Sequence, residues 1–528
     1  MKKILMTGTM LLIVATISTR CSKELKLAPL GELTEQTFYQ TEADFDAASL
    51  APYATLLSFY FDQFGNGFYQ PNLWPDDDVT VRSNEPDDIE DFNWLPGNGN
   101  FTSVWQTCYT GIQRANLVMA QLPKATKFAD TANKSRYEGE AKFMRAYFNL
   151  ILATYWGTPP LAKDVVKTLD ETRMPSSAPG EIWDFIETDL LYAKANLPTM
   201  WDPSNIGRAT SGAASGLLGR TLLYRAQWEN KPTLYAKADA EFAALIASPN
   251  YSLLDVKYSD NFALDAENNR ESLFEIQFAY GRDNNWFPND QGGGSGTGRY
   301  IMWRTGCEQG QCAGGANADG YGFMHVVLPL QNEFEPNDPR RKQTIFKEGD
   351  PFPDGVTPVF KSIWSVTGST PSKYIIRDKK GAEITGWQPN MGINNERVLR
   401  LADIYLMSAE CKILGPATDL AGAANLINKV RERADPTKLI LLPRSAAVSK
   451  DQMFKYLMHE RRVELALEGH RYNDLVRWHR AGLIKIKTDI DFGRTRANNN
   501  WSEKNLLRPV PQRELDLNSN LKQNPGYN

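Results

Sequence analysis

Residues 137–155, YEGEAKFMRAYFNLILATY, decide the fold class. Apolar and small side chains recur every three or four positions along one row, as on one face of an α-helix. This row consists of Tyr137, Ala141, Met144, Phe148, Ile151 and Tyr155, and a second row beside it contains Phe143, Tyr147 and Leu150. Because both rows must be covered, we expect this helix to lie inside a stack of helices.

The same spacing recurs on both sides of this stretch. It predicts further helices over about 105–119, 182–197, 214–228, 401–414, 420–430, 454–467 and 472–483. The row over 182–197 is interrupted by the polar residue Asp189. Breaks rich in proline and glycine at 156–160 and 197–198 separate consecutive helices, although no repeat of fixed length is present. The pattern predicts a mostly α-helical fold built as a helix-turn-helix solenoid with little β structure.

The middle of the chain, about 251–395, has a different character. Residues 273–278, LFEIQF, alternate like a strand, and residues 291–300, QGGGSGTGRY, exclude a regular element. Long irregular segments of compact proteins are either functional or disordered, and the many aromatic residues here argue against disorder. We therefore expect a loop-rich insertion between an N-terminal part, about 21–250, and a C-terminal part, about 396–528.

The N-terminus has the pattern of an export signal. Lys2 and Lys3 precede an apolar stretch over 4–17, which is too short for a transmembrane helix but fits a secretory signal peptide over residues 1–20. Cys21 follows at once, which predicts cleavage before it and lipidation of its thiol. Arg20 stands where lipoprotein signals usually have a small residue, so a conventional cleaved signal is the alternative. No later stretch has the length and hydropathy to span a membrane.

The remaining cysteines do not suggest a disulfide framework. Cys108 and Cys411 fall on apolar helical faces, where we expect buried free thiols. Cys307 and Cys312 share a Gly-rich stretch and could close a small disulfide loop. Their spacing lacks a nearby histidine or second cysteine pair, so we expect no zinc site.

Sequence motifs for catalysis and cofactor binding are missing. Position 463 is Val463, so the helix that carries His459 lacks the H-E-x-x-H zinc motif, and its Arg and Glu residues predict a charged helix laced by ion pairs. The glycine run at 292–298 lacks the Gly-Lys-Ser/Thr ending of a phosphate loop, and no G-x-S-x-G elbow is present. A net charge of −4 also argues against nucleic-acid binding. We expect no enzyme activity, cofactor or metal.

Acidic residues leave two alternatives open. Paired carboxylates can hydrolyse glycosides, and Asp76 to Asp78 or Glu333, Glu335 and Asp338 supply such groups, so a surface glycosidase is a minor alternative. The Asp triplet could instead hold calcium, although a run of Asp is usually a solvated loop.

Aromatic residues in loops are the remaining functional signal. Sugar rings present an apolar face and a hydroxyl rim, which suit aromatic platforms flanked by amide and charged side chains. Two candidate ligand-binding clusters have this composition; the alternative for each ring is that it packs a loop onto the helical body. The candidates are Trp74, Asp76, Arg82, Asn93 and Trp94 in the early loop, and Trp286, Tyr300, Trp303 and Tyr321 in the insertion.

Several motifs spread over the chain together resemble the SusD/RagB family. They are LTEQTFY at 33–39, TEADF at 41–45, GEAKFMRAYF at 139–148, RLADIYLMSAE at 400–410, ERR at 460–462, EGHR at 468–471, DLVRW at 474–478, PQREL at 511–515 and QNPGY at 523–527. They occur in the family's order over essentially the whole mature chain.

The resemblance implies one mostly α unit with a tetratricopeptide-like helix-turn-helix scaffold and a variable, loop-rich ligand-binding part. It further implies a lipid-anchored protein, exposed on the outer membrane, that forms a lid on a SusC-like TonB-dependent transporter and delivers a glycan to it. Some members of the family are linked to peptides, so a peptide-binding, RagB-like lid is the alternative. The matched motifs are scaffold residues, so no catalytic residue follows from the resemblance.

Overall fold

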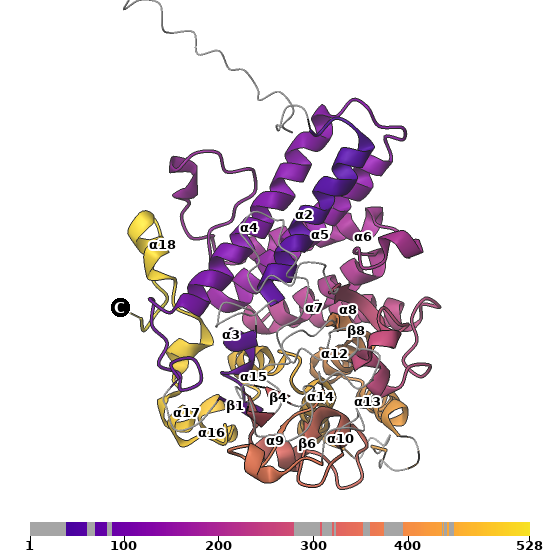
Figure 1. The fold of residues 1–528 in the computed structure, drawn as a ribbon, viewed down its shortest axis with the longest axis vertical. Coiled ribbons are helices and arrows are strands. Elements are labelled where there is room, and N and C mark those ends of the chain that lie inside the picture. The colour runs from indigo at the N-terminus through magenta and orange to yellow at the C-terminus, as the bar shows by residue number, and fades with distance from the viewer. Residues whose placement is uncertain are drawn as a thin grey trace, which may run out of the picture.

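The computed structural model describes residues 38–60, 69–81, 87–278, 307–308, 319–320, 324–351, 359–373, 394–435, 437, 441–442 and 448–527. Helices dominate these residues (Figure 1). The longer helices are α2 (Glu42–Tyr60), α4 (Gly99–Gln121), α5 (Asn133–Trp156), α6 (Glu181–Asn196), α7 (Ser211–Trp228), α8 (Leu234–Ile246), α12 (Leu401–Leu414), α13 (Leu420–Ala434), α14 (Lys450–Leu465) and α15 (Arg471–Arg480).

The long helices form one continuous stack. Each of α4 to α7 packs on the next α-helix in the chain, α8 packs on α12, and α12 packs on α13 and α14. Consecutive helices that contact mainly their neighbours are the pattern of a helix-turn-helix array. The prediction of a mostly α-helical solenoid is therefore confirmed for the described residues, and α8 and α12 are neighbours although about 150 residues separate them in sequence.

Helix α5 lies in the middle of this stack, as its two apolar rows predict. Every residue from Phe143 to Trp156 is buried, so the helix is covered on all sides. Helix α4 approaches it closely, because an added Cβ at Gly111 would lie 2.1 Å from the Phe148 ring. The helix ends where Gly157 adopts a φ of 76°, a conformation that favours glycine.

The polar break at Asp189 has a structural reason. Its carboxylate accepts hydrogen bonds from Nε and Nη2 of Arg145 on α5, at 2.7 and 2.9 Å. Arg145 also donates from Nη1 to the Asn116 side chain of α4 at 2.7 Å. A buried charge must be paired, so this polar cluster fixes the register of α4, α5 and α6.

Short strands close the insertion at its base. β2 (Ser272–Ile276) pairs antiparallel with β8 (Glu396–Arg400), with Ser272 opposite Arg400. This ladder holds the two ends of the insertion together, so the stack continues directly from α8 to α12. The other two-residue strands pair as β1 (Val79–Thr80) with β5 (His325–Val326), β3 (Cys307–Glu308) with β4 (Asp319–Gly320), and β6 (Ile345–Phe346) with β7 (Thr370–Pro371).

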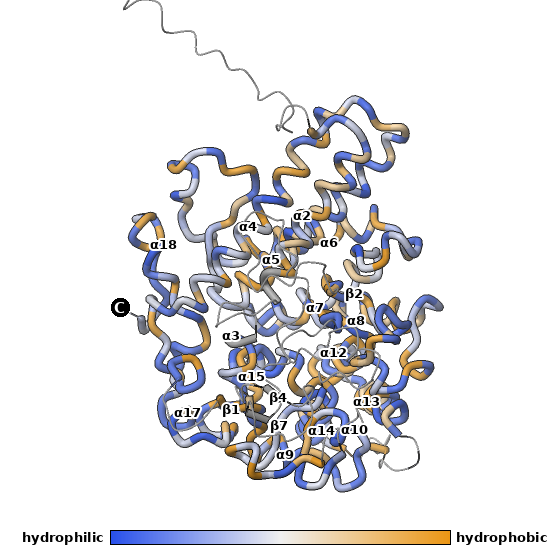
Figure 2. Tube along the Cα trace, in the orientation of Figure 1, coloured by the Kyte–Doolittle hydropathy of each residue, from blue (hydrophilic) through white to orange (hydrophobic). Residues whose placement is uncertain are grey.

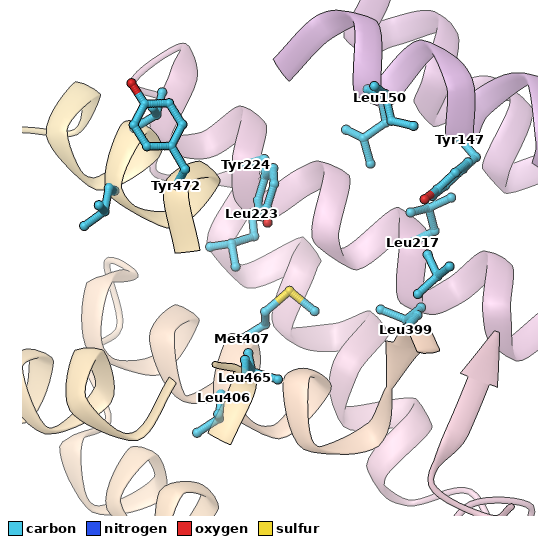
Figure 3. Packing of buried hydrophobic residues seen from close by; sticks show 14 of the residues in the cluster. Tyr147, Leu150, Leu217, Leu223, Tyr224, Leu399, Leu406, Met407, Leu465 and Tyr472 are labelled. Atoms are coloured by element: carbon cyan, nitrogen blue, oxygen red, sulfur yellow. The ribbon is translucent and has the colours of Figure 1, made fainter. Parts of the chain in front are cut away.

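One large apolar core runs through the stack. Figure 3 shows Tyr147 and Leu150 of α5 above Leu217 of α7, and Met407 of α12 beside Leu465 of α14. Polar and apolar stretches alternate along the helical part of the chain trace (Figure 2), as helices with buried faces require. Among the described helices, none is long and apolar enough to cross a membrane. Cys108 and Cys411 are buried free thiols, as predicted.

The C-terminal segment returns to the N-terminal helices. It carries the short helices α16 (Ile486–Asp489), α17 (Thr495–Asn500) and α18 (Gln512–Leu517), and α18 lies beside the lower part of α4 (Figure 1). The Trp156 indole at the end of α5 donates to the Pro509 carbonyl at 2.9 Å. The remaining short helices are α3 (Tyr69–Leu73), α9 (Leu328–Glu333) and α10 (Arg340–Thr344).

Candidate functional site

The two tryptophans of the early loop lie in the core, which corrects their proposed role as open sugar platforms. Trp94 is 1% exposed, and its indole donates to the Ile89 carbonyl at 2.9 Å. The rings of Phe101 and Tyr472 pack edge-on against it, at centroid distances of 5.5 and 5.9 Å. Trp74 is also buried, at 8% exposure, whereas Asn93 is exposed. For Trp74 and Trp94, packing of the loop onto the body is therefore the right interpretation.

The Asp76 to Asp78 triplet is neither a solvated loop nor an open ligand site, because all three residues are buried. Arg471 of α15 donates to Asp77 from Nε and Nη2 at 2.7 and 2.8 Å, and Arg462 of α14 donates to Asp78 at 2.9 Å. Burial raises the pKa of Asp77, but Arg462 and Arg471 outweigh it and lower the pKa to about 2. The triplet ties the early segment to the C-terminal helices.

The pKa of Asp76 is shifted in the direction opposite to that of Asp77. Burial, and then the charge of Asp78, raise the pKa of Asp76 well above the usual range of a carboxyl group. Within the described ranges, no group of three or more His, Cys, Asp or Glu side chains has a metal-binding arrangement. The calcium alternative for this triplet therefore has no support from the geometry.

The charged helix around His459 is more buried than its sequence suggests. Instead of ion pairs along one exposed face, Glu464 of α14 accepts from Arg400 of β8 at 2.6 Å and from Arg340 of α10 at 3.0 Å. Arg400 also donates to Glu468 at 2.8 Å and to Glu271, next to β2, at 2.8 Å. Burial alone would raise the pKa of Glu468, but the charges of Arg400 and Lys373 outweigh burial and lower the pKa to about 2. These carboxylates are fully engaged with arginines and hold the fold together.

The remaining predicted site residues lie outside the described residues. They are Arg82, Trp286, Tyr300, Trp303 and Tyr321. The proposed lipidation site Cys21 and the cysteine Cys312 also lie outside them, and only the backbone of Cys307 is described, as part of β3. Their roles remain predictions.

The described scaffold fixes the points where these segments leave it. The strand pair β1–β5 places Val79 opposite Val326. Val81 and Met324 therefore flank the same short ladder. Arg82 follows Val81 directly, and Tyr321 precedes Met324 by three residues. At the second departure point, the Phe278 amide donates to the Asn395 side chain at 2.8 Å. Segments from the early loop and from the insertion therefore start at adjacent positions on the scaffold.

Several pockets open among the described residues, and we call the one lined by Trp201 and Tyr251, which no sequence motif predicted, the Trp201 pocket. It has a volume of about 240 Å³ and lies between the α6–α7 connection, residues 199–210, and the segment 250–275 that leads into β2. Its walls combine Trp201 and Tyr251 with amide, hydroxyl and guanidinium side chains. The sequence feature that could have indicated this pocket is an aromatic residue in a Pro-marked break between helices, since Trp201 follows Pro198 by three residues.

Models of protein families match most of the chain. The model described as "SusD family" matches residues 270–527, and the model described as "Starch-binding associating with outer membrane" matches residues 62–223. The two matches cover α4 to α6, most of α7, α12 to α15 and the C-terminal segment, whereas α8 and part of the Trp201 pocket lie in the stretch 224–269 between them.

Individual relatives match over nearly their whole length. A SusD-like protein of Bacteroides ovatus is 28% identical over 89% of this chain and 82% of its own. The starch-binding protein SusD of Bacteroides thetaiotaomicron is 24% identical over 88% of this chain and 87% of its own. Among solved structures, a laminarin-binding SusD-like protein is similar with a TM-score of 0.75 and 26% identity, over 93% of this chain and 100% of that one.

Proposed function

Because the chain belongs to the SusD family, we propose that it binds an oligosaccharide or polysaccharide at the cell surface and delivers it to a SusC-like TonB-dependent transporter. The observation that carries the proposal is similarity over almost the full length of relatives named for starch and laminarin binding. The laminarin-binding relative also shares the helical fold.

The proposed ligand contacts are the aromatic residues of the insertion with their polar neighbours. Burial removes Trp74, Asp76 and Trp94 from the candidate set. The remaining candidates are Arg82, Asn93, Trp286, Tyr300, Trp303 and Tyr321. Stacked rings contribute about 1 kcal/mol each, and hydroxyl hydrogen bonds a similar amount. A few such contacts supply the roughly 4–8 kcal/mol of a millimolar to micromolar complex.

We propose that a lipid anchor holds the protein on the outer membrane. Residues 1–20 would act as a signal peptide, and the lipidated Cys21 would anchor the mature chain as one SusD/RagB-like unit over 21–528. The description of the family model over residues 62–223 supports association with the outer membrane. Exchange of Cys21 for alanine should release the protein from the membrane fraction; membrane retention of that variant would exclude the lipid anchor.

Isothermal titration against a polysaccharide panel tests the binding function. Wild-type protein should show saturable binding to at least one member, and Trp286→Ala and Trp303→Ala should each weaken it by about fivefold or more. Trp156→Phe serves as a control, because Trp156 is 1% exposed and its indole donates to the Pro509 carbonyl, so it is not available to a ligand. Absence of binding to every glycan, with binding to peptides instead, would favour the RagB-like alternative. Unchanged affinity in both loop variants would exclude these two residues as contacts.

A further inference from the structure

The Trp201 pocket combines an exposed apolar rim with a fixed aromatic ring. Met200 is 67% exposed and Ile206 56%, and both line the pocket. The indole of Trp201 donates to the Ala209 carbonyl at 2.8 Å, which sets the orientation of the ring. The guanidinium groups of Arg136 and Arg208 lie 5.3 and 5.7 Å from the ring centroid and support it further.

The charged groups of the pocket are already neutralised. Arg208 pairs with Asp46 at 2.8 Å and with Glu140 at 3.1 Å, and Arg270 pairs with Asp255 at 2.6 Å. A ligand for this pocket therefore meets no free guanidinium, which argues against an anion and in favour of an uncharged molecule.

Three polar side chains of the wall remain available. Within the described part of the chain, the side chains of Thr199, Asn250 and Ser272 make no hydrogen bond, while their neighbours are engaged. Asn268, for example, exchanges two hydrogen bonds with Gln277, at 2.9 and 3.0 Å. Two hydroxyls and one amide next to an apolar rim match the hydroxyl edge and the C–H face of a sugar ring.

We propose that the Trp201 pocket is a second carbohydrate contact site, which takes one sugar unit of a glycan also held by the insertion loops. The inference rests on the proposed glycan-binding function. A volume of about 240 Å³ is smaller than the roughly 300–1,000 Å³ of pockets that enclose a whole drug-sized ligand. The pocket therefore suits one sugar unit of a glycan, and the apolar face of that sugar would lie on Met200, Trp201 and Ile206.

The pocket lies close to the point where the insertion leaves the described scaffold. Glu275 lines the pocket, and Phe278, three residues further along, is the last described residue before the insertion. Three extended residues span about 10 Å. A second contact on the same chain raises the apparent affinity through a high effective concentration, so the pocket should favour long glycans over short ones.

A double variant, Met200→Ala with Asn250→Ala, tests the inference in the full-length protein. The probes are laminarin, soluble starch, xylan, xyloglucan, galactomannan and pectin. For whichever polysaccharide wild type binds most tightly, the variant should bind about three- to tenfold more weakly. The matched control is Leu254→Ala, since Leu254 is 55% exposed and does not line the pocket. It should bind like wild type.

Methionine-methyl NMR gives a second readout in the same proteins. The Met200 signal, identified by its loss in Met200→Ala, should shift when the polysaccharide saturates the protein. If wild type binds none of the six probes, the proposed function fails together with this site. If wild type binds, but the double variant matches Leu254→Ala and the Met200 signal does not move, the second site is overturned and the glycan-binding function stands.

Discussion

Trp94 shows how burial decides the role of a single aromatic residue. Removal of a large ring that is 1% exposed leaves a cavity, so Trp94→Ala should lower the free energy of unfolding by about 3–5 kcal/mol. Denaturant titration measures this change. The neighbour Leu95 is 57% exposed, and Leu95→Ala should cost less than about 0.5 kcal/mol. A Trp94→Ala protein that keeps its stability but loses glycan binding would return Trp94 to the ligand site.

His470 predicts a pH dependence of stability. Burial, the largest influence, lowers its pKa to about 4 in the folded chain. Between about pH 6.5 and 4 the unfolded chain therefore binds a proton that the folded chain does not, and the free energy of unfolding falls as the pH is lowered through this window. Because His470 is only half-buried, we expect a loss of about 2 kcal/mol or less.

The comparison with His470→Asn isolates this effect. Glu140, whose pKa burial raises to about 7, titrates in the same window with the opposite sign. The difference in stability between wild type and His470→Asn removes that contribution. Chemical denaturation at pH 8, 6 and 4.5 should show wild type losing stability relative to the variant. A constant difference across the three pH values would contradict a lowered pKa of His470 in the folded chain.

Whether a candidate ligand residue is buried or exposed was harder to predict than the fold. An aromatic side chain in a loop has the same sequence signature whether it packs inward or faces solvent, as Trp94 and Trp201 show. The orientation of Trp94 depends on Phe101 and Tyr472, and Tyr472 is almost 400 residues away in the sequence. Local patterns cannot contain that information.

At the scale of elements, close approach of α4 and α5 depends on a glycine. An added methyl at Gly111 would overlap the Phe148 ring, so Gly111→Ala should force the helices apart and cost about 1–3 kcal/mol. Gly99 belongs to the same helix, and an added Cβ there meets no atom within 4 Å. Thermal unfolding of Gly99→Ala should show wild-type or slightly higher stability. Equal effects of the two changes would argue against tight packing at Gly111.

The long helices could be predicted because their apolar spacing is a local property. The rows over 105–119, 137–155, 182–197 and 214–228 correspond to α4, α5, α6 and α7. The pairing of β2 with β8 and the contact between α8 and α12 could not be predicted, because both depend on partners far away in the sequence.

At the scale of the whole molecule, Arg400 joins segments from three parts of the chain. It pairs with Glu271, Glu464 and Glu468, and all four residues are buried. Arg400→Met leaves three buried carboxylates with one partner fewer, so the free energy of unfolding should fall by about 3–5 kcal/mol. Urea denaturation measures this loss.

The exposed pair of Arg173 and Asp170 provides the control. Its two charges lie 3.0 Å apart at the surface, and Arg173→Met should change stability by less than about 1 kcal/mol. If both methionine variants had similarly small effects, the buried arginine would not be the link that joins the segments around Glu271, Arg400 and Glu464.

We propose that the protein captures a glycan without altering it. The most direct test titrates wild-type protein with each polysaccharide by calorimetry and then analyses the recovered glycan by size-exclusion chromatography. We predict saturable binding of at least one polysaccharide, with its chain length unchanged after long incubation. Absence of binding across the panel, or shortened chains in the recovered glycan, would contradict the claim.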